Sequence, residues 1–213
     1  MRLRKVANAK EILEENPMYI KNATAYKGKW QSAFDAIQEI HLEIGTGKGD
    51  FIISKAMAHP EINFIGMEKY ESVLVRAIEK LGSKTLPNLR FICFDASNIQ
   101  ELFEREITTL YLNFSDPWPK KKHEKRRLTS PSFLDSYDSI FVRVAHIIQK
   151  TDNISLFAYS LEMFSKHGYT LEKVSLDLEN ESLENYQSEY EKRFIAQGYK
   201  INYVEAIKNV KEI

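Results

Sequence analysis

A turn with glycine at every second position links a strand-like segment to a helix-like segment. Gly45, Gly47 and Gly49 lie between the alternating residues 39–44 and the apolar residues of 51–58. Glycine lets the backbone turn sharply and lets a ligand approach the main chain closely, so a turn in this position is typical of nucleotide-binding α/β folds. The spacing is not that of a P-loop, because no Ser or Thr follows the lysine of the turn. It is not the Gly-x-Gly-x-x-Gly fingerprint either, because the last position of that pattern is Asp.

Strand-like and helix-like patterns alternate along most of the chain. Strands are predicted at residues 39–44, 62–67, 89–94, 107–114, 144–149, 171–178 and 200–207. Helices are predicted at residues 51–58, 70–81, 99–103, 131–142, 154–167 and 188–197. This alternation predicts an α/β fold with a mainly parallel sheet of seven strands and helices on both faces. The two late strands around a short helix predict an antiparallel edge at the C-terminal end.

The length of 213 residues favours one domain. We expect residues 37–213 to form that domain. Residues 1–36 have weak periodicity and several Lys and Asn, so we expect a basic, partly disordered N-terminal arm with one short helix near residues 10–15.

Composition excludes several classes of protein. The single cysteine, Cys93, excludes a disulfide framework and a Cys-rich zinc site. We expect no metal site, because His123 has no partner ligands in the sequence around it. No apolar run reaches the length of a membrane span, and the basic start lacks the apolar stretch of a secretion signal. We therefore expect a cytoplasmic protein that does not bind membranes.

A formal net charge of zero conceals two segregated runs of charge. Residues 120–127 read KKKHEKRR, whereas residues 172–191 contain seven acids and one lysine. A focused basic patch suits a polyanion such as nucleic acid. The alternative is a solvated charged loop.

Three acids lie at the carboxyl ends of successive predicted strands. Glu43, Glu68 and Asp95 would meet at one edge of the sheet, where open α/β sheets bind their ligands. Glu68 follows Gly45 by 23 residues, a spacing that suits hydrogen bonds to ribose hydroxyls. Asp95 is placed for an adenine amino group. Each acid alone is more often a surface residue or a helix cap, and it is the three together that indicate a site.

The fourth predicted strand runs into Asp116-Pro-Trp118-Pro, directly before the basic run. Two prolines stiffen this loop and reduce the entropy lost when a substrate orders it. Trp118 offers a flat face for a base and Asp116 offers two acceptors. The alternative is a rigid turn around a buried tryptophan. An adenosine-type site beside this loop and a phosphate-binding run is the layout of a nucleobase-modifying enzyme.

The block NFSDPWPKKKHEKRRL resembles the signature of bacterial tRNA (guanine-N7)-methyltransferases. The likeness extends to residues 26–30, the glycine turn, Glu68, Asp95, and the segments 150–153 and 188–191. The resemblance implies a Rossmann-like class I methyltransferase fold, S-adenosylmethionine as methyl donor, and a guanine at position 46 of the tRNA variable loop as acceptor. It implies no obligate protein partner and leaves monomer or homodimer open.

The resemblance also implies roles for individual residues. Cofactor-binding positions of the family correspond to Glu43, Gly45, Gly47, Gly49, Glu68, Asp95 and Asp116. Positions that bind tRNA correspond to Lys120, Lys121, Lys122, His123, Lys125, Arg126, Arg127, Asp152, Ser188 and Glu191. Asp116 is the expected catalytic residue, in an orienting and electrostatic sense. The N-terminal arm, with Arg2, Arg4 and Lys5, is either a further tRNA contact or a solvated tail.

The chain departs from the family pattern at three places. Val144-Ala145 stands where members commonly have Gly-Gly, Ile154 stands where they commonly have Arg, and Ser188 replaces Thr with its hydroxyl retained. Two other functions stay open on the sequence. An exocyclic-amine nucleic-acid methyltransferase has a similar Asp-Pro loop, and a non-catalytic RNA-binding protein would need only the basic run. A nicotinamide dehydrogenase is disfavoured by the glycine spacing.

Overall fold

The computed structural model describes residues 6–210, in which seven strands form one sheet in the order β3-β2-β1-β4-β5-β7-β6. The strands are β1 (Ile40–Ile44), β2 (Asn63–Glu68), β3 (Leu89–Cys93), β4 (Thr109–Asn113), β5 (Val144–Thr151), β6 (Thr170–Ser175) and β7 (Asn202–Asn209). Strands β1 to β5 pair in parallel, and β7 pairs antiparallel with both β5 and β6. The mainly parallel sheet with an antiparallel C-terminal part is confirmed. The last strand, β7, lies inside it, and β6 forms the edge.

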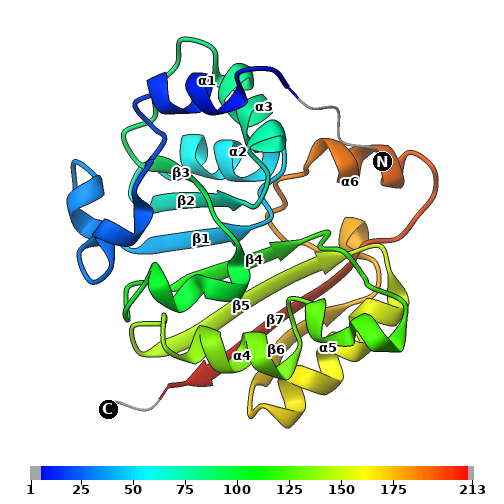
Figure 1. The fold of residues 1–213 in the computed structure, drawn as a ribbon. Coiled ribbons are helices and arrows are strands. Elements are labelled where there is room, and N and C mark those ends of the chain that lie inside the picture. Colours follow the sequence, from blue (N-terminus) through cyan, green and yellow to red (C-terminus); the bar gives the residue numbers. More distant parts are fainter. Residues whose placement is uncertain (1–5, 211–213) are drawn as a thin grey trace.

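Helices cover both faces of the sheet (Figure 1). The α-helices are α1 (Ala9–Glu15), α2 (Asp50–Ala58), α3 (Glu71–Leu81), α4 (Pro131–Asp138), α5 (Ile154–Lys166) and α6 (Glu189–Ile195). Short 3-10 helices are η1 (Ala23–Tyr26), η2 (Trp30–Ala33), η3 (Ala96–Glu101), η4 (Lys121–Arg126) and η5 (Leu178–Asn180). Helices α1 to α3 share one apolar core with the sheet, and α4 and α5 share the other. No helix among residues 6–210 combines the length and apolar character that a membrane span requires.

The chain changes direction across the sheet at β1. Strands β1, β2 and β3 progress towards one edge, and β4 returns to the other side of β1 before β5 continues away. In open α/β sheets the crevice for a ligand forms at such a switch point, beyond the carboxyl ends of the strands. The loops after β1 and β4 lie next to each other there because β1 and β4 are hydrogen-bonded neighbours.

The predicted boundaries differ most at α4. The helix was expected over residues 131–142 but ends at Asp138, because the buried Phe141 continues in an extended bridge to Ile107. Strand β5 begins at Val144, as expected, so the missing Gly-Gly pair does not move this boundary. Ile154 opens α5 and is 59% exposed.

Residues 6–36, the described part of the expected N-terminal arm, place several buried side chains against the domain, and the expected partial disorder of the arm stays a prediction. Helix α1 is present near the predicted position, and it packs on α3 with Leu13 fully buried. Trp30 is also fully buried, and its indole N–H donates to the carbonyl of Leu102 at 2.7 Å. The carboxylate of Glu106 accepts the main-chain N–H of Trp30 at 2.7 Å. Scattered large apolar side chains, rather than a regular period, attach this segment to the core. Arg2, Arg4 and Lys5 lie outside the described residues.

Trp30→Ala should lower the free energy of unfolding by about 3–5 kcal/mol, because it removes a large buried ring and leaves the Leu102 carbonyl without its donor. Urea unfolding followed by circular dichroism measures the change. Lys29→Ala, at an exposed neighbouring position, is the control and should change stability by less than about 0.5 kcal/mol. Equal stability of Trp30→Ala and the wild type would contradict the packing of this segment on the domain.

Candidate active site

Two neighbouring cavities open at the carboxyl ends of β1 and β4. The larger has a volume of about 640 Å³ and is lined by Glu68, Asp95, Asp116 and Trp118 among others. The smaller, of about 410 Å³, lies between the glycine turn and α6. Gly45, Asn113 and Phe114 line both cavities. The structure thus brings most of the predicted cofactor residues together at the switch point.

The three glycines of the turn have different tasks. Each has a positive φ, between 58° and 79°, which L side chains rarely adopt. A Cβ at Gly45 would meet nothing within 4 Å, so this part of the turn leaves open space beside both cavities. A Cβ at Gly49 would lie 2.7 Å from Cβ of Ala77 in α3. Gly49 lines neither cavity and permits α2 and α3 to pack closely, and its contact with the cofactor stays a prediction.

Glu43 is buried at the base of the smaller cavity. Its carboxylate accepts hydrogen bonds from the Thr46 hydroxyl at 2.6 Å and the Asn113 side-chain amide at 2.8 Å. Burial raises the pKa of Glu43 to about 7. The two hydrogen bonds and the positive charge of Lys150 oppose this rise. The amide oxygen of Asn113, also buried, has no hydrogen-bond partner within residues 6–210. A cationic donor entering here would meet two acceptors, one of them a carboxylate.

Glu43 should make stability fall as pH rises. Between its ordinary pKa of 4.5 and about 7, the unfolded protein has lost the Glu43 proton while the folded protein retains it, so this stabilisation is full below pH 4.5 and lost above pH 7. Between pH 5 and 8, the free energy of unfolding of Glu43→Gln should therefore rise by on the order of 3 kcal/mol relative to that of the wild type. Urea unfolding at both pH values, without cofactor, measures it. Glu39→Gln, at a side chain 68% exposed, is the control. Parallel pH profiles of Glu43→Gln and wild type would contradict the burial argument.

Glu68 connects the glycine turn to the end of β2. Its carboxylate accepts the main-chain N–H of Gly47 at 3.1 Å and the N–H groups of Lys69 and Tyr70 at 2.8 and 3.1 Å. Burial raises the pKa of Glu68, these three N–H groups oppose that rise, and nearby Asp116 adds to it. Asp95 accepts the N–H of Ser97 and pairs with Lys69 at 2.6 Å. Both acids face the larger cavity, as predicted from their places at strand ends.

The loop after β4 carries Asp116 and Trp118 on the wall of the larger cavity. Asp116 is exposed, and Trp118 is half-buried against His123 and Arg126. Phe114 and Trp118 have φ values of 51° and 42°, in the left-handed region. Such a conformation costs a bulky residue on the order of 1–3 kcal/mol and is concentrated at functional sites. The surrounding contacts therefore have to hold this loop in place.

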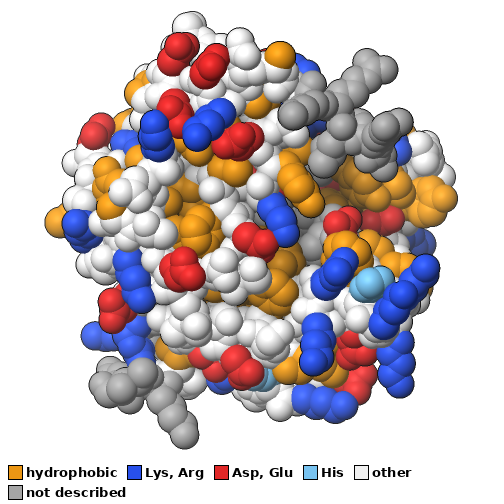
Figure 2. Space-filling view, viewed as in Figure 1, with side chains coloured by type: hydrophobic (Ala, Val, Ile, Leu, Met, Phe, Trp, Pro, Cys, Tyr) orange, Lys and Arg blue, Asp and Glu red, His pale blue; other side chains and the backbone are white. Residues whose placement is uncertain are grey.

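The predicted basic run forms η4 on the rim of the larger cavity. Lys120, Lys121 and Lys122 are exposed, and Lys125 and Arg126 line the cavity mouth. Figure 2 shows Lys and Arg side chains gathered on the right of the view, beside the carboxyl end of β4. Arg127 differs: its guanidinium turns inward, to the carbonyls of Pro117 and Trp118.

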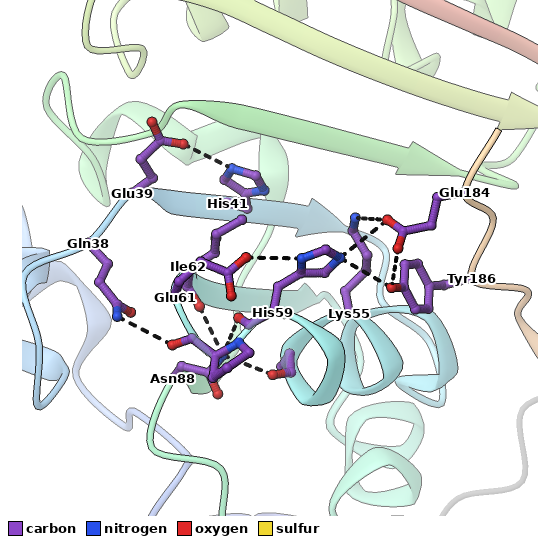
Figure 3. A network of polar contacts seen from close by, with 12 residues as sticks. Gln38, Glu39, His41, Lys55, His59, Glu61, Ile62, Asn88, Glu184 and Tyr186 are labelled. Atoms are coloured by element: carbon purple, nitrogen blue, oxygen red, sulfur yellow. Dashed lines mark hydrogen bonds and ion pairs between the residues drawn. The ribbon is translucent and has the colours of Figure 1, made fainter.

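The acidic segment before α6 forms ion pairs with the domain through carboxylates that stay exposed. Figure 3 shows Glu184 and Tyr186 reaching Lys55 of α2 and His59, the residue directly after this helix. Further along, Glu189 pairs with Lys48 of the glycine turn at 2.9 Å. This segment, residues 181–191, thereby brings α6 over the smaller cavity.

Three predicted tRNA contacts fall on or beside this segment. Ser188 lines the smaller cavity and caps α6 by accepting the N–H of Glu191 at 3.1 Å. Asp152, after β5, accepts a hydrogen bond from the Tyr190 hydroxyl. Glu191 is fully buried and pairs with Lys150 at 2.7 Å. A buried, paired carboxylate is not presented to a large ligand in this structure, and the assignment of Glu191 to tRNA stays a prediction.

Sequence reasoning missed Asn113, Thr46 and Lys150. Asn113 is a buried polar residue at the carboxyl end of β4, the same kind of position that singled out the three acids. Lys150 is a lysine near the end of a buried strand, only 3% exposed, and a cation in that position signals a buried anionic partner. Thr46 lies inside the glycine turn and carried no signal of its own. Residues 6–210 contain no cluster of three or more His, Cys, Asp or Glu placed to hold a metal ion.

Comparisons with known proteins agree with this geometry. A family model described as "Putative methyltransferase" matches residues 37–204. The tRNA (guanine-N(7)-)-methyltransferase of Listeria welshimeri serovar 6b is 51% identical over 209 residues, covering 97% of this chain and 98% of its own. The protein of the same name from Geobacillus sp. (strain WCH70) is 50% identical over 204 residues, covering 94% and 93%.

Solved structures share the fold at low sequence identity. A 16S rRNA methyltransferase, KamB, has a TM-score of 0.63 at 14% identity, covering 87% of this chain and 92% of its own. An antibiotic-related methyltransferase has a TM-score of 0.62 at 20% identity, covering 98% and 97%. Fold, cavity and nearly full-length sequence similarity agree, and the chain belongs to the tRNA (guanine-N(7)-)-methyltransferase family.

Proposed function

We propose that this protein transfers a methyl group from S-adenosylmethionine to N7 of a guanine in tRNA, at position 46 of the variable loop. The observation that carries the proposal is one cavity with Glu68 and Asp95 on one wall, Asp116 and Trp118 on another, and the basic η4 on its rim. Adenosine recognition, base recognition and phosphate binding are thus adjacent. Because the substrate is tRNA, we place the activity in the cytoplasm.

The residues present fit S-adenosylmethionine. Its methionine ammonium group suits the buried pair of acceptors formed by Glu43 and the unpartnered amide oxygen of Asn113. Its ribose and adenine suit Glu68 and Asp95, which face the larger cavity, and the open space at Gly45 admits the link between the two ends. When bound, the cofactor supplies an electrophilic methyl group on a sulfonium.

Guanine N7 is a hydrogen-bond acceptor with a free lone pair. It carries no proton, so this chemistry needs no general base to create the nucleophile. The chain has to align the base, exclude water and stabilise the positive charge that develops on the ring. Asp116 can accept hydrogen bonds from guanine N1–H and the exocyclic amino group, both of which become better donors as the charge develops. Trp118 offers a face for the base, and its half-buried ring is fixed by Arg126 and His123.

Incubation with S-adenosylmethionine and unmodified tRNA transcript, followed by mass spectrometry of the nucleosides, tests the proposal. We expect 7-methylguanosine, and we expect none from a transcript with adenine at position 46. Formation of N6-methyladenosine or N4-methylcytidine instead would establish the exocyclic-amine alternative. No methylation together with tRNA binding and no cofactor binding in calorimetry would establish a non-catalytic RNA-binding protein.

The exposed lysines of η4 should bind tRNA phosphates and account for much of its salt dependence. Lys121→Ala/Lys122→Ala/Lys125→Ala should weaken tRNA binding and reduce the slope of log K against log salt by about 2 to 3. Filter binding at several salt concentrations measures the slope. Lys166→Ala, at an exposed lysine at the end of α5, is the control and should leave it unchanged. An unchanged slope in the triple variant would contradict the assignment of η4.

A further inference from the structure

Arg127 ends the basic run but does not face the solvent as the lysines before it do. We propose that Arg127 is a positioning residue, which holds the Asp116–Trp118 loop in its working shape, and that it is not a phosphate ligand. This inference rests on the proposed function, because the loop that Arg127 holds carries the residue assigned to the base.

The guanidinium of Arg127 contacts two main-chain carbonyls and an aromatic ring. Its Nε donates to the carbonyl of Pro117 at 3.0 Å, and an Nη donates to the carbonyl of Trp118 at 3.2 Å. The ring of Tyr159, from α5, lies 4.3 Å from the guanidinium carbon. A planar fork that bonds two successive carbonyls and stacks on an aromatic ring is fixed in direction. These bonds use two of the five N–H donors, and together with the Tyr159 ring they fix the direction in which the guanidinium points.

The loop depends on these two bonds. Among residues 6–210, Arg127 makes the only hydrogen bonds to the main chain of residues 115–119. The same loop contains Trp118 at a φ of 42°, a conformation that a free loop would leave. Two prolines keep the loop stiff, but they supply no main-chain donors of their own. Arg127 therefore supplies the hydrogen bonds that hold the main chain of the loop, while the Trp118 ring packs on His123 and Arg126.

The neighbouring lysines provide the contrast. Lys121 and Lys122 are exposed and form no ion pair within the described chain, whereas Arg127 is half-buried. The basic run thus divides by direction: its lysines point to the solvent, and its last arginine points to the base-binding loop. The lysines and Arg127 carry the same charge, but only the planar guanidinium of Arg127 can donate two parallel hydrogen bonds. Lysine at position 127 would keep the charge and lose the two parallel bonds.

Arg127→Lys and Arg127→Ala are the test variants, with Lys121→Ala/Lys122→Ala as the matched control. For Arg127→Lys we expect unchanged tRNA affinity and salt slope, and a kcat lower by about tenfold. For Arg127→Ala we expect kcat lower by about 10²-fold, the loss that a misplaced reacting group causes. The control pair should instead lose affinity and salt slope. Thermal melts establish that all variants are folded.

Acrylamide quenching of tryptophan fluorescence reads the loop without any reaction. The chain has two tryptophans, and Trp30 is fully buried, so quenching reports on Trp118. We expect Arg127→Ala to increase quenching and the lysine control to leave it unchanged. Unchanged quenching in Arg127→Ala, wild-type kcat in Arg127→Lys, or a reduced salt slope in Arg127→Ala would each overturn the inference. If the wild type forms no 7-methylguanosine, the proposed function fails, while the quenching comparison still decides whether Arg127 holds the loop.

Discussion

Asp116→Asn should lower kcat for methyl transfer by about 10²- to 10³-fold, the loss seen when one preorganised charge-stabilising group is removed. The substitution keeps the size of the side chain but replaces one acceptor by a donor and removes the negative charge. Guanine gains positive charge during the reaction, so the loss falls on the transition state rather than on the bound substrate. The affinity for tRNA should stay within about twofold, because phosphate contacts dominate it.

Single-turnover rates at saturating enzyme, with tRNA binding and cofactor binding measured separately, separate these contributions. Asp135→Asn is the matched control, since this carboxylate lies on α4 and is 72% exposed, and it should leave all three quantities unchanged. If Asp116→Asn keeps a near-normal single-turnover rate, the electrostatic role is wrong. If it loses cofactor binding instead of rate, Asp116 belongs to the cofactor site alone.

Lys150→Met should lower the free energy of unfolding by about 3–5 kcal/mol, because it leaves the carboxylate of Glu191 buried without its cation. Lys150 donates to Glu191 at 2.7 Å, to the Asn185 side chain at 3.0 Å and to the carbonyl of Tyr186 at 3.2 Å. The double variant Lys150→Met/Glu191→Leu should recover most of the loss, since an apolar pair of similar volume often replaces a buried ion pair at little cost.

Urea unfolding of the two single variants and the double variant gives the coupling energy directly. Lys48→Met is the control, because the Lys48–Glu189 pair is exposed and should contribute less than about 1 kcal/mol. Equal losses in Lys48→Met and Lys150→Met would show that burial of the second pair has no energetic consequence. A double variant no more stable than Lys150→Met would show that the loss comes from packing rather than from the unpaired charge.

The sheet and the position of the site were predictable because they follow from local periodicity. Residues 62–67 form a short, mostly apolar run, and Glu68 ends β2, so its place on the cavity wall followed from the strand alone. The direction of a side chain in a charged run did not follow. Arg127 and Glu191 belong to runs of like charge, and only the tertiary contacts to Trp118 and Lys150 turn them inward.

The N-terminal segment could not be predicted for a related reason. Its apolar residues, such as Leu13 and Trp30, are spaced without a helix or strand period. Periodicity detects an element that buries one regular face. A segment that enters the core one residue at a time, through Leu13 on α3 and Trp30 on Leu102, shows none. Its order depends on surfaces that distant parts of the chain provide.

The contact between Gly49 and Ala77 joins the glycine turn of the site to a helix, α3, whose Ala77 lies outside the site. Because an added methyl group at Gly49 would lie only 2.7 Å from Ala77, the side chain at position 77 limits how the turn before α2 can bend. A larger side chain at position 77 would clash with the turn, although Ala77 lines neither cavity. Position 77 of α3 is thus restricted to small side chains by a turn to which it does not belong.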